Sequence, residues 1–439
     1  YISKPGDYKS FTVDPDGQAA YFGNVSVAAV SEYNLKSNFI KKQEIAGTIA
    51  GEHLGGTWAD QPGNSMSMNY SGDRMVVGEG WGSGGRVLIY HKNSTGTWEL
   101  NTTLTNPDSV NIFPHGIDMS SDGNRIFVLR GEYNVSGPKG RIFVYDYSNG
   151  WSNTPTTTLV QPSSPATSPY FAKRVACSPD GNTCSLIEGR AAVFIWKYSN
   201  DAWSVTPATI NVGDVSAMSY NNDGTLLMIG LKLDDTGGTN IGRVHVYEYD
   251  GSWSKVQELP GQSASEYFGE LIKINANGTR AVISGPLNDE DGNNAGRVYI
   301  WDRNVSGTWE LTQDIASESG ASGEFGGDIF INKIGNRVVI GANTDSSVDS
   351  DRGSVHIYDR GDDGQFSITQ SINGEQSGES FGFSVCGDEN ANYIIVSGPS
   401  NDEGGTDVGR LYAYEADTSS SPPGVTYDID TLAFHHGNF

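Results

Sequence analysis

The chain has 439 residues, and its 53 acidic and 28 basic residues give a formal net charge of −25 at pH 7. Nucleic acids and anionic membrane surfaces bind basic footprints, so this balance excludes nucleic acid as a partner. No apolar run approaches the roughly 18–20 residues that a membrane-spanning helix requires, so direct membrane insertion is excluded as well.

Read from the N-terminus, the sequence repeats one apolar strand at intervals of about 50 to 58 residues. Weaker copies lie at 25–33 and 191–198. The clear copies, most of which open with Gly-Arg, begin at Gly85, Gly140, Gly242, Gly296, Gly353 and Gly409. Eight copies at this spacing are typical of four-stranded propeller blades that stack face to face.

Signals for further strands flank each copy. Upstream, Asp-Gly or Asn-Gly pairs accept the positive φ angles of a two-residue turn between antiparallel strands. These pairs begin at Asp16, Asp122, Asp180, Asp223 and Asn277. Downstream, a fourth strand usually opens with an aromatic residue, at Trp98, Trp151, Trp203, Trp253, Trp309 and Phe366. Each repeat therefore supplies four strands, which we name a, b, c and d in chain order.

These repeats predict an all-β fold, a β-propeller of eight blades with four antiparallel strands each, with seven blades as the alternative count. In this interpretation residues 1–416 form the propeller and 417–439 form a C-terminal extension or linker. The last repeat has strands a to c but no evident strand d. We expect the segment before Asp7 to supply that outer strand and close the ring.

Three cysteines are too few for a disulfide scaffold, so apolar burial must hold the fold together. Cys177 and Cys184 flank a tight turn, where opposed strands bring Cβ atoms within bridging distance. Two interpretations are open for them, a disulfide and a pair of buried thiols. Cys386 has no evident partner and is interpreted as a small buried apolar residue.

The last three repeats share a Phe-Gly pair that precedes Gly-Pro or Gly-Ala, an acidic loop and the apolar strand. The pairs are Phe268-Gly269 with Gly285-Pro286, Phe325-Gly326 with Gly341-Ala342, and Phe381-Gly382 with Gly398-Pro399. Over about residues 261–415 the chain therefore resembles the FG-GAP repeats of integrin α-chain propellers and their microbial and algal relatives, whereas the first four units lack the Phe-Gly pair. The resemblance implies an extracellular or cell-surface propeller that binds ligands or neighbouring proteins, and it does not imply catalysis.

Some members of that family hold calcium in an Asp-x-Asp-x-Asp-Gly loop between strands a and b, and no repeat here has that complete pattern. A different acidic cluster recurs between strands b and c. Its candidate ligands are Asp289, Asp291, Asp345, Asp349, Asp351, Asp402 and Asp407. Carboxylates in a Gly-rich loop can coordinate calcium, and a solvated acidic loop is the alternative. Calcium is therefore the one cofactor that the sequence suggests.

Two other recurring side chains have a functional and a structural interpretation. The strand-c arginines either bind an anion in the central channel or pair with acidic neighbours, and pairing is favoured. They are Arg86, Arg141, Arg243, Arg297 and Arg410. The strand-d aromatics either form a sugar-stacking platform or pack between blades, and packing is favoured. No histidine spacing or nucleophile motif indicates a catalytic residue.

Seven Asn-x-Ser/Thr sequons are candidates for glycosylation. They stand at Asn24, Asn69, Asn93, Asn101, Asn134, Asn277 and Asn304. Asn93, Asn134 and Asn304 fall in predicted turns or loops, where a glycan projects without disturbing a strand. In a eukaryotic source we expect some of the seven to be occupied.

Together these features favour a secreted, non-enzymatic structural or adhesive module, a subunit of a larger surface assembly or filament. Its expected partners are other protein subunits, in a homo- or hetero-oligomer, or surface glycans. The alternatives are a carbohydrate-active enzyme, a lyase or glycosidase, and a glycan-binding lectin, each using the propeller face. The channel lining discriminates between them, because convergent acids, histidines or tyrosines favour an enzyme and apolar or small residues favour a module.

Overall fold

The computed structural model describes residues 8–13, 20–24, 27–32, 38–56, 65–80, 84–107, 113–131, 140–162, 174–188, 192–317 and 323–417. The chain divides into two compact units. The propeller unit is Lys41–Glu415, and the terminal unit combines Tyr1–Ile40 with Ala416–Phe439. Among these described residues no helix is long and apolar enough to cross a membrane.

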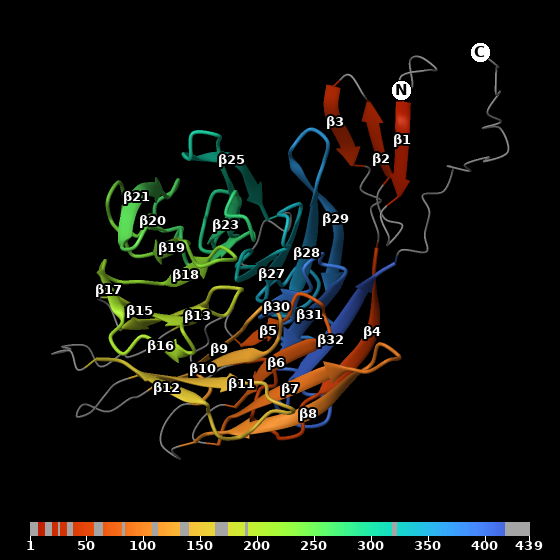
Figure 1. The fold of residues 1–439 in the computed structure, drawn as a ribbon. Helices are drawn as coiled ribbons and strands as arrows, with labels where there is room; N and C mark the ends of the chain where they lie inside the picture. The colour runs from red at the N-terminus through yellow and green to blue at the C-terminus, as the bar shows by residue number, and fades with distance from the viewer. Residues whose placement is uncertain are drawn as a thin grey trace, which may run out of the picture. The chain divides into compact units, whose positions relative to one another are not determined.

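Within its described residues, the propeller unit forms seven four-stranded antiparallel sheets, the blades, in a ring (Figure 1). Blade 1 is β5 (Met66–Met68), β6 (Arg74–Glu79), β7 (Arg86–Lys92) and β8 (Trp98–Thr105). Blade 2 is β9 (Gly116–Met119), β10 (Arg125–Gly131), β11 (Gly140–Asp146) and β12 (Thr157–Val160). Blade 3 is β13 (Val175–Cys177), β14 (Thr183–Glu188), β15 (Ala192–Ser199) and β17 (Ala208–Asn211), and the short β16 (Ala202–Trp203) also pairs with β15.

The later blades repeat the same order of strands from the channel outward. Blade 4 is β18 (Ala217–Tyr220), β19 (Leu226–Leu231), β20 (Arg243–Tyr249) and β21 (Trp253–Pro260). Blade 5 is β22 (Ile272–Ile274), β23 (Arg280–Gly285), β24 (Arg297–Arg303) and β25 (Trp309–Ala316). Blade 6 is β26 (Asp328–Ile331), β27 (Arg337–Ala342), β28 (Ser354–Arg360) and β29 (Phe366–Asn373). Blade 7 is β30 (Val385–Gly387), β31 (Tyr393–Gly398), β32 (Arg410–Ala416) and β4 (Phe39–Ala46).

The all-β propeller is confirmed, and the described blades number seven, the alternative to the eight that the repeats favoured. The weak copy at 25–33 became a false eighth blade because β3 (Val27–Glu32) pairs only with β2 (Ala20–Asn24), which in turn pairs with β1 (Tyr8–Val13). These strands form a three-stranded sheet of the terminal unit.

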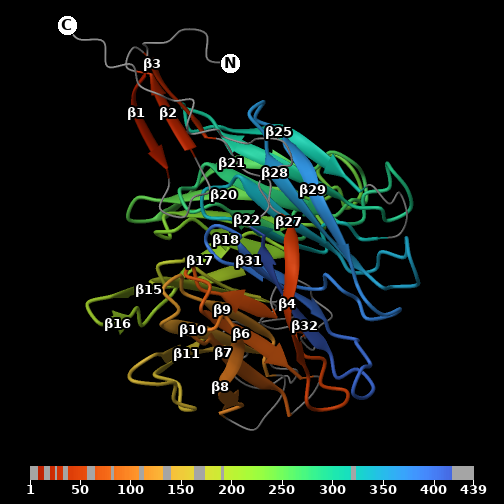
Figure 2. The same ribbon diagram turned by 90° about the vertical axis from the view of Figure 1, so that its right-hand side faces the viewer.

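The outer strand of the last blade is β4, so the prediction that the segment before Asp7 closes the ring is wrong in its residues (Figure 2). The segment before Asp7, which we expected in this place, lies outside the described residues. Blade 7 thus combines three strands from the end of the propeller sequence with one from its beginning.

A ring of backbone hydrogen bonds joins the seven a–b turns at one end of the channel. In each turn the second residue after strand a bonds to its equivalent in the next blade. The bonds run from Tyr70 N to Ser121 O (2.8 Å), Ser121 N to Pro179 O (2.6 Å), Asp180 N to Asn222 O (3.0 Å), Asn222 N to Ala276 O (2.9 Å), Ala276 N to Lys333 O (3.0 Å), Lys333 N to Glu389 O (2.8 Å) and Glu389 N to Tyr70 O (2.9 Å). Pro179 has no N–H, so Asp180 donates in its place. Because the last bond returns to Tyr70, the blades close on themselves.

A polar side chain also closes each a–b turn internally. The residue directly after strand a accepts a hydrogen bond on its side chain from the backbone N–H five positions later. These residues are Asn69, Ser120, Ser178, Asn221, Asn275, Asn332 and Asp388. The turns therefore have the same geometry although only some of them contain Asp-Gly or Asn-Gly.

The strand-d aromatics pack between blades, which confirms the favoured interpretation. Trp309 is 2% exposed and shares an apolar cluster with Leu226 and Met228 of blade 4. The Gln257 side chain also donates to Trp309 O (2.7 Å) and accepts from Trp309 N (2.8 Å), tying strand d of blade 4 to strand d of blade 5. The same two-bond contact joins Gln43 to Trp98 and Gln313 to Phe366.

Candidate functional site

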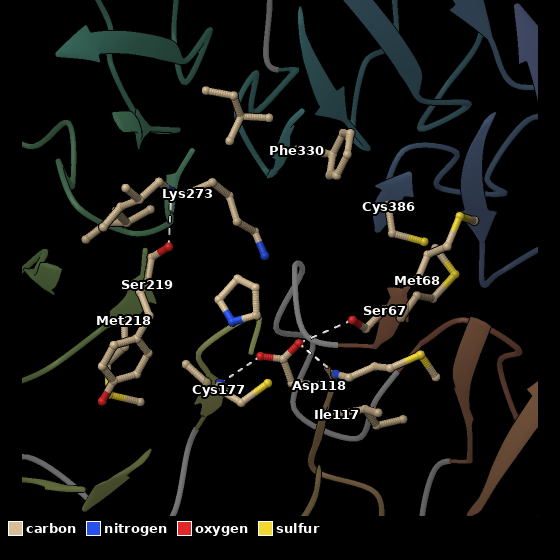
Figure 3. Close-up of a pocket in the computed structure, with 18 of the residues that line it drawn as sticks. Ser67, Met68, Ile117, Asp118, Cys177, Met218, Ser219, Lys273, Phe330 and Cys386 are labelled. Atoms are coloured by element: carbon tan, nitrogen blue, oxygen red, sulfur yellow. Dashed lines mark hydrogen bonds between the residues drawn. The ribbon is translucent and has the colours of Figure 1, made fainter. Parts of the chain in front are cut away.

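The central channel contains a cavity of about 180 Å³ next to the ring of a–b turns (Figure 3). Strand a of every blade contributes to its wall, and Tyr70, Ser121 and Pro179 of the ring line it as well. Most of the lining side chains are apolar or small, and the charged ones are Asp118, Arg174 and Lys273. Catalysis in a propeller channel would depend on such charged residues.

The Asp118 carboxylate is held by three donors. It accepts hydrogen bonds from Cys177 N (2.8 Å), Met119 N (2.9 Å) and Ser67 Oγ (3.2 Å), as Figure 3 shows in part. Cys177 lies on strand a of the following blade and Ser67 on strand a of the preceding blade. Asp118 therefore links three neighbouring inner strands.

The same link recurs between other blades. Asp328 is 1% exposed and accepts hydrogen bonds from Val385 N and Ile329 N, both at 2.8 Å. Burial raises the pKa of Asp328. Ser219 Oγ accepts from Ile274 N (3.1 Å) in the same way. Side-chain acceptors thus join adjacent inner strands, which belong to separate sheets and share no backbone ladder.

Lys273 extends from β22 into the cavity (Figure 3). Within the described part of the chain its ammonium group forms no hydrogen bond and no ion pair. Arg174, by contrast, lies 3.4 Å from Glu270 Oε1, and Glu270 Oε2 also pairs with Lys232 Nζ at 2.5 Å. Of the three charged residues of the cavity, Asp118 is held by hydrogen bonds and Arg174 is paired with Glu270. Lys273 has neither a hydrogen bond nor an ion pair within the described residues, and the rest of the wall is mostly apolar or small.

The Phe-Gly motifs form corners where one blade meets the next. A Cβ atom at Gly296, which precedes strand c of blade 5, would lie 2.3 Å from Phe325 O and 2.5 Å from Phe325 N. Gly296 also has a φ of +83°, so glycine is required there on two grounds. The pairs Gly242 with Phe268 and Gly353 with Phe381 have the same close approach.

Blades 1 and 2 contain the same corner in a form that the sequence analysis missed. Gly409 abuts Leu54, where a Cβ atom would lie 2.5 Å from Leu54 N. Gly55 N donates to Gly78 O (2.9 Å), as Gly269 N does to Ser284 O. Gly85 approaches Phe113 O in turn. The signal was present as an apolar residue ahead of strand a, but Leu54 replaces the phenylalanine and Pro114 follows Phe113 in place of glycine.

A buried glutamate supports the corner in blades 5 and 7. Glu266 is fully buried and accepts hydrogen bonds from Asn288 Nδ2 (2.9 Å) and the Tyr299 hydroxyl. In blade 7, Glu379 accepts from Asn401 Nδ2 and the Tyr412 hydroxyl, both at 2.7 Å. Burial and the adjacent carboxylates raise the pKa of both tyrosines.

Blade 6 replaces this arrangement with a serine, a histidine and an aspartate. Ser354 Oγ donates to Asp345 Oδ2 (2.6 Å) and lies 2.9 Å from His356 Nε2, and His356 Nδ1 lies 2.9 Å from Ser371 Oγ. In a hydrolase triad the histidine stands between the serine and the acid. Here Ser354 stands between the other two and is fully buried, so the geometry is that of a structural network.

Acidic side chains of the b–c loops accept hydrogen bonds from backbone N–H groups of the same loops. Asp289 Oδ1 accepts from Asn294 N (2.7 Å), and Asp402 Oδ1 accepts from Asp407 N (2.8 Å). Asp345 is buried, and Ser350 Oγ lies 3.4 Å from Asp351 Oδ2. All seven predicted calcium ligands lie in the described residues, where no three His, Cys, Asp or Glu side chains are grouped to hold a metal ion. Calcium binding by these loops stays a prediction.

Four of the five strand-c arginines, Arg86, Arg243, Arg297 and Arg410, pair with nearby acids, as favoured. Arg297 pairs with Asp291 and with Glu290 (3.1 Å), and Arg410 pairs with Glu403 (2.9 Å). Arg352, one position before the equivalent site in blade 6, pairs with Asp349. The arginines therefore neutralise part of the loop charge.

The predicted glycosylation sites differ in how exposed their side chains are. Asn277 and Asn101 are exposed, and Asn93 and Asn304 are half-buried in c–d turns. Asn69 is only 1% exposed, and its side chain closes an a–b turn, so a glycan there is incompatible with the fold and that prediction is corrected. The side chain of Asn24 and the whole of Asn134 lie outside the described residues.

Cys177 and Cys184 are directly opposed on β13 and β14, as the turn predicted. Both are buried free thiols, so the structure has the second of the two interpretations and the disulfide is not formed. Burial raises the pKa of both thiols far above the usual value, which disfavours the thiolate that disulfide formation requires. Cys386 is also a buried free thiol.

The fold defines the chain as a seven-bladed β-propeller. No protein-family model matches the sequence, and no curated protein matches it either. The resemblance to FG-GAP repeats therefore rests on the repeated corners described above.

Proposed function

We propose that this chain is a non-enzymatic extracellular module, a structural or adhesive subunit of a larger surface assembly. The observation that carries the proposal is the structural role of Asp118, whose carboxylate lies in the channel cavity and holds neighbouring strands together. A general acid or base must exchange a proton with substrate, whereas Asp118 accepts three hydrogen bonds that join neighbouring inner strands. The channel therefore favours a scaffold over a catalyst.

The outer surface supports binding to other macromolecules. The b–c loops of blades 4 to 7 carry acidic residues in excess of their arginines, and they form part of a chain with a net charge of −25. Such a surface attracts basic protein surfaces or cation-bridged partners. Outer strands β8, β25 and β29 each contain a β-bulge against strand c, which discourages unspecific pairing of exposed edges.

The first experiment measures assembly. The full chain is followed by size-exclusion chromatography with light scattering and by negative-stain electron microscopy, with and without calcium. We expect particles larger than one chain, formed by repeated contacts. A chain that remains monomeric at every concentration, with and without calcium, would contradict the proposal.

The second experiment addresses the enzymatic alternative directly. A panel of polysaccharides is incubated with the full chain, and new reducing or unsaturated ends are quantified. We expect no release above background. Release that disappears in an Asp118→Ala or Lys273→Ala variant that still folds would identify a carbohydrate-active enzyme. Retention of intact glycans on an array, without cleavage, would instead favour the lectin.

A further inference from the structure

Sulfur atoms are concentrated around the channel cavity. The chain has six methionines and three cysteines. Four of the methionines and two of the cysteines line this one cavity: Met66, Met68, Met119, Met218, Cys177 and Cys386. Met75, Met228 and Cys184 do not line it. Methionine fills irregular gaps in any core, but that role alone does not explain why the rare sulfur residues gather here.

Three of these residues belong to one apolar cluster at the junction of blades 7 and 1. Met66 and Met68 are alternate residues of β5, and Cys386 is in the middle of β30. All three belong to one packed cluster, and each is 7% exposed. Met75, which is fully buried and stands opposite Met68, belongs to the same cluster but does not line the cavity. Figure 3 shows the side chains of Met68 and Cys386 at the same side of the cavity. Two thioethers and one thiol therefore lie together at the edge of an enclosed space.

The other sulfur atoms of the cavity have different neighbours. Met218 Sδ accepts a hydrogen bond from Ser185 Oγ (3.4 Å). Cys177 stands opposite Cys184 in the β13–β14 hairpin. Met119 packs in a separate cluster between blades 1 and 2. Among the described residues that line the cavity, the junction of blades 7 and 1 is thus the place where two thioethers and a thiol belong to one cluster.

Thioether and thiolate sulfur are soft ligands, and a set rich in thioethers suits a soft monovalent ion such as Cu⁺ or Ag⁺, whereas calcium and magnesium prefer oxygen ligands. Burial and the neighbouring Asp328 carboxylate raise the pKa of the Cys386 thiol to about 12, although the positive charge of Lys273 opposes the rise. A soft cation must therefore displace the thiol proton when it binds, and that proton leaves to solvent through the cavity.

We propose that Met66, Met68 and Cys386 form a binding site for a soft monovalent metal ion, Cu⁺ or Ag⁺, that is reached through the channel cavity. This inference is independent of the proposed structural or adhesive function. It also differs in ligand chemistry and in place from the acidic b–c loops.

The test uses Ag⁺, which needs no reductant, with the full chain in chloride-free buffer. After desalting, bound silver is quantified by mass spectrometry. We expect one tightly bound ion per chain, and we expect Cys386→Ser and the double variant Met66→Leu/Met68→Leu each to lower the affinity at least tenfold. The matched control Met228→Leu changes a methionine outside both the cavity and this cluster and should retain the affinity. Leucine keeps the methionine volume, so both sets should fold.

A second measurement on the unaltered chain does not depend on the variants. With ¹³C-methyl methionine, addition of Ag⁺ should shift the Met66 and Met68 resonances and leave that of Met228, which packs in another cluster, in place. The proposal is overturned if no silver binds, if cavity and control variants lose affinity equally, or if all methionine resonances shift together. A Cu⁺ titration in the presence of ascorbate should give the same ranking of variants.

Discussion

Blades 5 and 7 build their Phe-Gly corners around a buried glutamate, whereas blade 6 builds the same corner without one. Gly323 stands in blade 6 where Glu266 and Glu379 stand in the other two, two residues before the phenylalanine. His356 and Asp345 then replace the tyrosine and asparagine partners. The backbone is nevertheless the same, because Gly326 N donates to Gly341 O as Gly382 N donates to Ser397 O.

The comparison separates two contributions to the corner. The close approach of a glycine to a phenylalanine backbone is common to all three blades and fixes the geometry. The polar network behind it differs, so it satisfies buried groups without determining the shape. Substitutions that disturb the close approach should therefore cost more stability than substitutions in the network.

The largest effect is expected for Gly296→Ala. Its methyl group would meet Phe325 N and O well inside contact distance, and the backbone has φ +83°. We expect a loss of about 3–5 kcal/mol in the free energy of unfolding. Gly96→Ala is the matched control, with φ +84° and no atom within 4 Å of the added Cβ, and should lose only about 1 kcal/mol. Urea denaturation measures both free energies of unfolding. Equal losses would show that the close approach of Gly296 to Phe325 does not contribute to stability.

Glu379→Ala should have the next largest effect. It leaves the Asn401 amide, the Tyr412 hydroxyl and the N–H of Gln376 without their acceptor in a buried site. We expect a loss of about 3 kcal/mol. The exposed neighbour Glu375 serves as control, and Glu375→Ala should stay within about 0.5 kcal/mol. If the two variants unfold at the same urea concentration, the buried network does not stabilise blade 7.

A smaller effect is expected for His356→Tyr, which imports the tyrosine of blades 5 and 7 into blade 6. Because Gly323 supplies no carboxylate, the new hydroxyl lacks the glutamate acceptor of the other two blades. Ser371 loses its contact with His356, and Ser354 keeps only its hydrogen bond to Asp345. We expect a loss of about 1–3 kcal/mol by thermal or urea unfolding. A gain in stability would mean that the networks are interchangeable.

The smallest effect concerns Glu324, next to Phe325 in blade 6. Burial and the charges of Glu270 and Asp351 raise the pKa of Glu324. A raised folded-state pKa means that stability falls as the pH rises from the usual carboxyl range through the folded pKa. Glu324→Gln should thus be more stable than the original chain at neutral pH, by a few tenths of a kcal/mol because the side chain is half exposed to water. The difference should vanish below about pH 4. A difference that does not change with pH would exclude this cause.

Much of the fold could be predicted from the sequence, because strand c is apolar on both faces and its opening glycine recurs. The blade count could not, because β3 resembles strand c locally and only pairing distinguishes it. The corner of blade 1 could not be recognised in the sequence because Leu54 stands where the other corners have phenylalanine. The inner strand links of Asp118 and Asp328 were also missed, since their role depends on which residue of the next blade lies opposite.

The acidic loops show a second limit of sequence reasoning. Asp289 and Asp402 stand at positions that suit a metal ligand and equally suit an acceptor for a loop N–H. Spacing alone does not distinguish these two uses. In the same way, the gathering of sulfur at the channel follows from ring closure, which brings Met68 and Cys386 together from distant parts of the sequence.

The most direct test of the account is an experimental density map of the full chain viewed along the channel. We predict seven blades, with residues 39–46 as the outer strand of the last blade and an unbroken circle of turns from Tyr70 to Glu389. An eighth blade that contains residues 27–32, or an open ring whose first and last turns do not meet, would contradict it.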